Sequence, residues 1–100
     1  MYPNVAGSRF DWDYYLGPHL DLARRILIPH GLVRIEVDRG LGAFPPGAPP
    51  PFHAVGHLFF RTLGELQAGL AATAPELIAD AAKYSQGQSV VMISEVFELA

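Results

Sequence analysis

The segment Phe52–Arg61 is largely apolar on both sides of an extended strand. One side carries Ala54, Gly56, Leu58 and Phe60, and the other carries His53, Val55, His57 and Phe59. Successive side chains of a strand point to opposite faces of a sheet, so both faces of this strand need cover. We therefore predict a central strand, with helices over one face and a different covering element over the other.

Two further segments are typical of strands. Leu32–Arg39 alternates apolar and charged residues, which favours a half-buried strand near an edge, and Ser89–Phe97 is rich in Val, Ile and Met, which favours a closing strand. Between the first two strands, Gly40–Pro51 holds three Gly and five Pro, so no regular element is expected there. This Pro/Gly-rich loop is either an exposed connection or a lid whose Phe44 covers a pocket.

The remaining segments have helical periodicity. Apolar residues recur at helical spacing from Asp11 to Ile28, with Asp11 placed to cap the first turn and Pro18 expected to kink or divide the helix. Later, Thr62-Leu63-Gly64-Glu65 and Thr73-Ala74-Pro75-Glu76 both have the form of a capping box. They predict two further helices, the second ending near Lys83.

The order helix, strand, strand, helices, strand lacks only a leading strand to form the split β-α-β unit of a ferredoxin-like fold. We therefore predict a single α+β domain over residues 1–100 with a four-stranded antiparallel sheet. Only Met1–Val5 could supply the first strand, and Pro3 disfavours it. We expect that the first strand is truncated and lies mostly upstream of Met1; the alternative is a very short strand.

Composition excludes several classes of protein. Seven Lys and Arg stand against ten Asp and Glu, a net charge of −3 that argues against nucleic-acid binding. The N-terminus lacks a secretory signal, and no stretch approaches the roughly 20 apolar residues that span a bilayer. The absence of Cys favours a reducing compartment, so we predict a soluble cytoplasmic protein. A chain of 100 residues is marginally stable alone, which makes a partner subunit a reasonable expectation.

The segment Phe10–Leu22 resembles the EthD family of the dimeric α/β-barrel superfamily, which shows F-D-x-D-Y-Y, three residues, and then His. His53–Phe60, Pro75–Ala81 and Ile93–Val96 are similar to that family's third strand, late helix and last strand. One position departs from the pattern, because family members commonly have Pro two residues after the His, where this chain has Asp21.

The resemblance implies a homodimer in which two four-stranded sheets pack face to face with the helices outside, forming a dimeric α/β barrel. It also implies a cleft between helices and sheet for a small, mostly apolar organic compound. The family has a genetic link to the breakdown of ether compounds alongside a cytochrome-type monooxygenase, so a catabolic or secondary-metabolite pathway is expected.

Three residues, His19, Tyr15 and Asp80, are candidates for chemistry. His19 lies on the apolar side of its helix. It is either a buried imidazole that only packs or a general acid or base in the cleft. Tyr15, one turn earlier, either orients that ring or a ligand, or simply packs. Tyr14 falls on the opposite side of a regular helix, so we expect it in a contact between subunits or at the plain surface. Asp80 either faces water or orients His19 or a ligand.

The expected ligand-binding residues are Trp12, Phe44, His53, His57, Phe59 and Asp80. The Cα atoms of His53 and His57 would stand about 13 Å apart along a strand, too far to share one ion, so we predict no metal site. No phosphate loop, nucleotide motif or nucleophile motif is present, so no cofactor is expected. Three functions stay open. The first is an enzyme that catalyses proton transfer, cyclisation or oxygenation without a cofactor. The others are a noncatalytic accessory protein for a separate oxygenase and an assembly scaffold.

Overall fold

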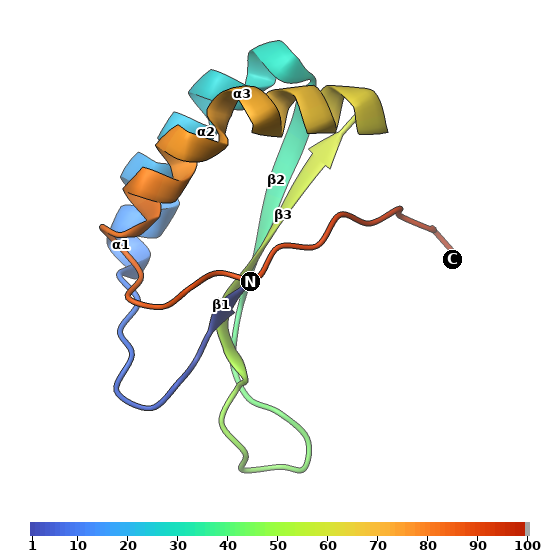
Figure 1. Ribbon diagram of the computed structural model, residues 1–100. Coiled ribbons are helices and arrows are strands. Elements are labelled where there is room, and N and C mark those ends of the chain that lie inside the picture. The colour runs from blue at the N-terminus through green and yellow to red at the C-terminus, as the bar shows by residue number, and fades with distance from the viewer. Residues whose placement is uncertain (100) are drawn as a thin grey trace.

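The computed structural model describes residues 1–99 and places its helices on one side of a small sheet (Figure 1). The elements, in chain order, are β1 (Tyr2–Pro3), α1 (Trp12–Tyr14), a π-helical turn (Tyr15–His19), α2 (Leu20–Leu27), a 3-10 turn (Ile28–His30), β2 (Leu32–Arg39), β3 (Phe52–Phe60) and α3 (Leu63–Ala81). Within residues 1–99, no helix has the length and apolar character needed to cross a membrane.

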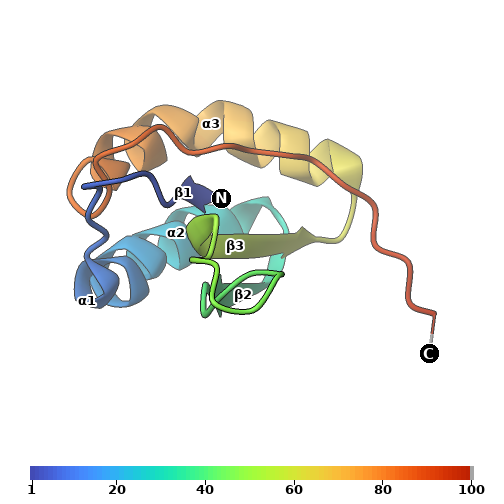
Figure 2. The same cartoon turned by 90° about the horizontal axis from the view of Figure 1, so that it is seen from below.

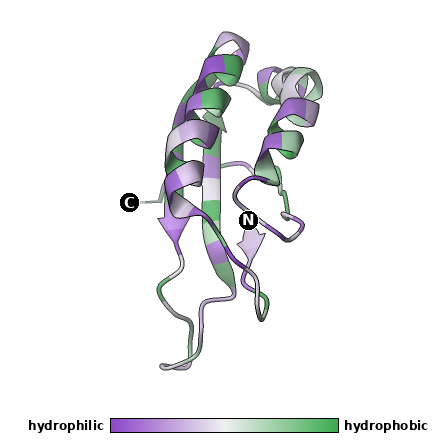
Figure 3. Cartoon of the chain, turned by 90° about the vertical axis from the view of Figure 1, so that its left-hand side faces the viewer, coloured by the Kyte–Doolittle hydropathy of each residue, from purple (hydrophilic) through white to green (hydrophobic). Residues whose placement is uncertain are grey.

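The sheet is antiparallel, with the strand order β1-β3-β2. The predicted central position of β3 is therefore confirmed. The residues of β3 that face the helices stand opposite residues of its two neighbours. Gly56 is opposite Val37 of β2, and Ala54 is opposite Tyr2 of β1. Figures 2 and 3 show the helices lying over this face, so the opposite face of the sheet is left open.

The first helical region runs without a break from Trp12 to His30. Asp11 caps it as predicted, because its Oδ1 accepts a hydrogen bond from the Tyr14 amide at 3.0 Å. Pro18 does not divide the helix; it lies inside the π-helical turn Tyr15–His19, whose wider spacing accommodates a residue that has no amide hydrogen. Gly31 ends the region with a φ of 96°, in the left-handed conformation that glycine favours.

Helix α3 is one helix, so the prediction of two was wrong. The first capping box forms, since the Thr62 hydroxyl accepts a hydrogen bond from the Glu65 amide at 3.1 Å. At the second box, the Thr73 hydroxyl instead donates to the Gly69 carbonyl at 2.8 Å within the helix. Gly69, Thr73 and Asp80 share one buried face, and keeping that face against the core favours a continuous helix over a new start at Thr73.

The predicted closing strand is also absent, since Ser89–Phe97 forms no strand. Only its start is paired: the Met1 and Val90 backbones exchange two hydrogen bonds of 2.8 Å. Because β1 comprises only Tyr2 and Pro3, residues 91–97 have no strand beside them within the described part of the chain. The described sheet therefore has three strands instead of the predicted four.

The core between helices and sheet has two parts. One is aromatic and is built on Tyr15 and Tyr84, with Leu20 beside them. The other is aliphatic and is built on Ala23, Leu27 and Leu32. The candidate site lies in the aromatic part, next to β1.

Candidate functional site

A chain of hydrogen bonds crosses the aromatic part of the core. His19 ends the π-helical turn, and its Nδ1 lies 2.8 Å from Oδ2 of Asp80 in the last turn of α3. Its Nε2 lies 3.1 Å from the hydroxyl of Tyr84, three residues past the end of α3. The Tyr84 hydroxyl lies 2.5 Å from that of Tyr2 in β1. Segments that are distant in sequence are thus joined in one chain of hydrogen bonds that passes through the imidazole.

The chemistry of the groups sets the direction of these bonds. An ionised carboxylate only accepts, so His19 donates its Nδ1 hydrogen to Asp80. In a neutral imidazole, Nε2 is then an acceptor, and Tyr84 donates to it. Tyr2 in turn donates to the Tyr84 oxygen. The arrangement is therefore an imidazole that is oriented by a carboxylate and coupled to a phenol.

Asp80 is held as a carboxylate at the outer end of the chain. Burial would raise its pKa, but hydrogen bonds from His19, Tyr14 and Lys83 outweigh this, and the pKa of Asp80 lies below its usual value of 3.8. The Tyr14 hydroxyl donates to Oδ1 at 2.8 Å, and the Lys83 ammonium lies 3.4 Å from the same oxygen. The alternative of an Asp80 that faces water is wrong, because its side chain is buried.

The phenols along the chain are held neutral. Burial raises the pKa of Tyr84, Tyr15 and Tyr2 above the usual value of 10. At neutral pH, Tyr84 is therefore a hydroxyl that can pass a proton in either direction, and not a phenolate.

Tyr15 fixes the position of the imidazole from one side. Its ring stacks on that of His19, with centroids 5.7 Å apart and planes 18° from parallel. Its hydroxyl reaches the sheet at Gly56, where a Cβ atom would lie 2.6 Å from the phenol oxygen. Glycine at position 56 therefore makes room for Tyr15, a close approach that no residue with a side chain allows without movement.

The space around the imidazole is filled by the chain's own rings. His19 is 6% exposed and Tyr15 is 2% exposed. The rings packed around them are those of Tyr2, Phe10, Trp12 and Tyr84.

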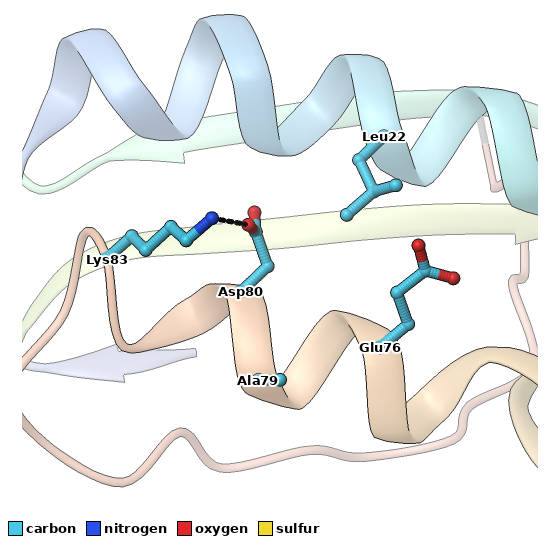
Figure 4. A pocket seen from close by; sticks show the side chains of 5 residues that line it. All are labelled: Leu22, Glu76, Ala79, Asp80 and Lys83. Carbon is cyan, nitrogen blue, oxygen red and sulfur yellow. Dashed lines mark ion pairs between the residues drawn. The ribbon is translucent and has the colours of Figure 1, made fainter.

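A hollow of about 370 Å³ lies instead at the Asp80 end, between α2 and α3 (Figure 4). It is lined by Leu22, Glu76, Ala79, Asp80 and Lys83. The carboxylate end of the hydrogen-bonded chain thus borders this hollow.

Two other predicted site residues border this cluster. Trp12 packs against Phe10 and has the Arg39 guanidinium 5.0 Å from its ring centroid. His53 stacks on Phe10 at 5.7 Å, and its Nε2 lies 2.9 Å from the Ser8 hydroxyl. Both therefore contact the ring cluster without touching His19.

The remaining predicted residues lie elsewhere. Phe44 is 92% exposed, in the loop between β2 and β3. His57 pairs with Asp38 at 2.9 Å, and Phe59 lies under the Arg34 guanidinium at 3.8 Å; both are on the open face of the sheet. Within residues 1–99, no three His, Asp or Glu side chains are placed to hold a metal ion.

Sequence reasoning missed Tyr2 and Tyr84 and placed Tyr14 on the wrong side. No local pattern marks the first two, since they act through contacts 82 and 65 residues apart in sequence. Tyr14 was placed with regular helical spacing, whereas the π-helical turn that follows shifts the helix so that its hydroxyl meets Asp80.

The crystal structure of an EthD-like protein from Ralstonia eutropha JMP134 has the same fold. It superposes with a TM-score of 0.87 and 30% sequence identity, over 95% of this chain and 85% of that chain. The chain belongs to the EthD-like family. The resemblance noted in the segment Phe10–Leu22 is thereby confirmed. No protein-family model matches the sequence, and no curated protein matches it.

Proposed function

We propose that this EthD-like protein binds a small, mostly apolar organic compound and exchanges a proton with it through Tyr84, His19 and Asp80. The observation that carries this proposal is the continuous chain of hydrogen bonds from the Asp80 carboxylate through the imidazole to the two phenols. A carboxylate that orients a neutral imidazole, itself coupled to a hydroxyl, is an arrangement suited to general acid–base catalysis.

Tyr2 indicates where a ligand would bind. Its phenol stands 2.5 Å from the Tyr84 oxygen, which is the position that an acidic hydroxyl or an enolisable carbon of a ligand would take. The ligand proton then passes to the Tyr84 oxygen while the Tyr84 proton moves to Nε2 of His19. The resulting imidazolium is stabilised by Asp80. Return of the proton to a different atom of the ligand completes an isomerisation, and its return to the same carbon completes a hydrogen exchange. Neither step needs a cofactor.

Ligand binding at this position requires the Tyr2 side chain, carried by strand β1, to leave it. The strand is two residues long and sits beside β3 through a register shift. The residues on either side are held by four hydrogen bonds. Met1 exchanges two with Val90 at 2.8 Å, and Asn4 donates to the Pro50 and Pro51 carbonyls at 3.0 and 2.9 Å. The reacting group of the ligand would then replace the Tyr2 hydroxyl as the partner of the Tyr84 hydroxyl.

We also propose that the protein acts as a homodimer through the open face of its sheet. Val55 and Phe59 of β3 lie on that face, which no helix covers (Figure 3). A central strand with apolar residues on both faces needs cover on both, and the sheet of a second copy would supply it.

The rings that fill the space around His19 favour the assembly scaffold, in which only the dimer matters. A second candidate that binds a ligand is the noncatalytic accessory protein. A pocket filled in this way would bind a compound by displacing Tyr2 without any proton transfer. The two candidates differ in whether His19 contributes to turnover or only to affinity.

The test uses 2-tetralone, an apolar enolisable ketone, as the probe. We expect the protein to bind it and to accelerate deuterium incorporation at its α-carbon, followed by NMR in D2O. His19→Asn should lower the rate about 100-fold or more while binding persists, because Asn can bond Asp80 but cannot carry the proton. His30→Asn, outside the hydrogen-bonded chain, is the matched control.

Binding without accelerated exchange in the natural protein would favour the accessory protein. Exchange that is equally fast in His19→Asn would refute the catalytic proposal. A second probe, 2-naphthol, tests binding of a phenol. If the protein binds neither 2-tetralone nor 2-naphthol, both candidates are refuted.

A further inference from the structure

Arg39 ends strand β2 on the side of the sheet that faces the helices. Its partner across the strands is Ala54 of β3, and Ala54 has Tyr2 of β1 on its other side. The three residues therefore form one row across the sheet, in which Arg39 stands two strands, about 10 Å, from Tyr2. Ala54 is 1% exposed, and the sheet places only its methyl group between the other two.

The Arg39 guanidinium lies over an aromatic ring. Its Cζ atom stands 5.0 Å from the ring centroid of Trp12, the only tryptophan of the chain. The ring of Trp12 is 4.9 Å from that of Phe10, and the ring of Phe10 is 5.2 Å from that of Tyr2. Two successive ring contacts thus join the guanidinium to the place where Tyr2 now stands.

The charge of Arg39 has no carboxylate partner within residues 1–99. Its neighbour Asp38 points to the open face of the sheet, where it pairs with His57 at 2.9 Å. The arginines of this part of the chain that form ion pairs are Arg24, Arg34 and Arg61. Since Arg39 is also exposed, its guanidinium is available to an anion from solution.

Burial increases inward from Arg39. Trp12 is half-buried, and Tyr15, whose ring is 6.0 Å from that of Trp12, is 2% exposed. A charged group is costly to bury without a partner, whereas an apolar ring gains from burial. A compound bound along this row is therefore stable with a charged end at Arg39 and an apolar body among the rings.

We infer that Arg39 binds a carboxylate of the ligand. The ligand is then an apolar ring compound whose carboxylate lies at the end remote from its acidic hydroxyl or enolisable carbon. A planar guanidinium offers two parallel N–H donors to a carboxylate, and its single charge matches one such group. This inference rests on the proposed function, since it places the reacting group of the ligand where the Tyr2 hydroxyl now meets Tyr84.

The experiment compares an acid with its neutral ester on the full chain. The probes are 6-hydroxy-2-naphthoate and its methyl ester, which share the naphthol rings and differ in the charge at one end. Isothermal titration calorimetry gives both dissociation constants, and the single indole N–H signal in 15N NMR spectra shows whether the probe reaches Trp12. We expect the acid to bind about tenfold or more tightly than the ester, and this preference to fall as salt is added.

Two substitutions of Arg39 test the source of the preference. Arg39→Gln should weaken binding of the acid to the level of the ester and leave binding of the ester unchanged, because only the acid uses the charge. Arg39→Lys should restore part of the preference, since it returns the charge without the planar pair of donors. Arg61→Gln is the matched control, because Arg61 is exposed beyond the other end of β3, where it pairs with Glu65. It should leave both constants unchanged.

The outcomes separate this inference from the proposed function. An acid that binds no more tightly than the ester, or a preference that persists in Arg39→Gln, refutes the carboxylate site. Accelerated deuterium exchange of 2-tetralone in the same preparation then leaves the proposed function standing. If the protein binds neither naphthoate, nor 2-tetralone, nor 2-naphthol, the carboxylate site and the proposed function are refuted together.

Discussion

All four tyrosines of the chain take part in one cluster around His19. Tyr2 and Tyr84 share a hydrogen bond, Tyr14 bonds Asp80, and Tyr15 stacks on the imidazole. Each has a pKa above the usual value of 10, in three of them chiefly because burial disfavours the phenolate. In Tyr14, the hydrogen bond to Asp80 is the first cause. Folding therefore depends on these phenols staying protonated.

This dependence predicts alkaline unfolding. An acid whose pKa is raised in the folded state stabilises that state fully below its unfolded pKa, here 10, and loses the contribution as pH rises. We expect the free energy of unfolding to fall above pH 10, with tyrosinate absorbance at about 295 nm appearing together with the loss of near-ultraviolet circular dichroism. Tyr84→Phe, which cannot ionise, should reduce this pH dependence. Tyrosinate formed while the fold stays intact would contradict the prediction.

The contacts of His19 with Tyr15 and Asp80 could be predicted from sequence, and the contacts that involve Tyr2 and Tyr84 could not. Tyr15 and His19 are four residues apart in one helical region, so local periodicity brings them together. The bond between His19 and Asp80 could be proposed because both lie in segments that resemble one family. Tyr2 and Tyr84 reach the imidazole through tertiary packing, which leaves no local pattern to find.

At the scale of elements, strands β2 and β3 could be predicted because their alternation and their Pro/Gly-rich boundaries are local features. Helix α3 shows why the same reasoning fails elsewhere. Thr62 and Thr73 start the same motif, yet only Thr62 caps a helix, because only Thr62 has an extended backbone. The Thr73 hydroxyl is buried inside the helix, and burial of that face, which the motif does not encode, decides its role.

The two threonines should therefore respond differently to the same change. Thr62→Asp keeps an acceptor that is favoured at the N-cap, so we expect the free energy of unfolding to change by less than about 0.5 kcal/mol. Thr73→Asp places a carboxylate in a buried helical position without partners, and should cost about 2 kcal/mol or more. Urea unfolding of both variants measures the difference. Equal, small effects would show that Thr73 caps a second helix.

At the scale of the whole molecule, the fold leaves one face of the sheet without cover. Helices α1, α2 and α3 all lie on the other face (Figures 2 and 3). The open face combines apolar side chains, Val55 and Phe59, with the ion pairs Arg34–Glu36 and His57–Asp38. Such a mixture of apolar and paired charged groups suits an interface in which the charges fix how the two sheets align.

A single lysine on this face should separate folding from dimerisation. Val55 stands opposite Asp38, so in Val55→Lys the new ammonium meets a carboxylate across the strands, and the protomer should keep its stability. Within a sheet-to-sheet interface the same ammonium would lose its hydration, and we expect the dissociation constant to rise about 100-fold. Ile78→Lys on α3 is the control, because Ile78 is 71% exposed on the helical side. Sedimentation equilibrium measures both variants. If Val55→Lys dimerises as tightly as the natural chain, the subunits meet through another surface, and the cover for β3 must be sought there.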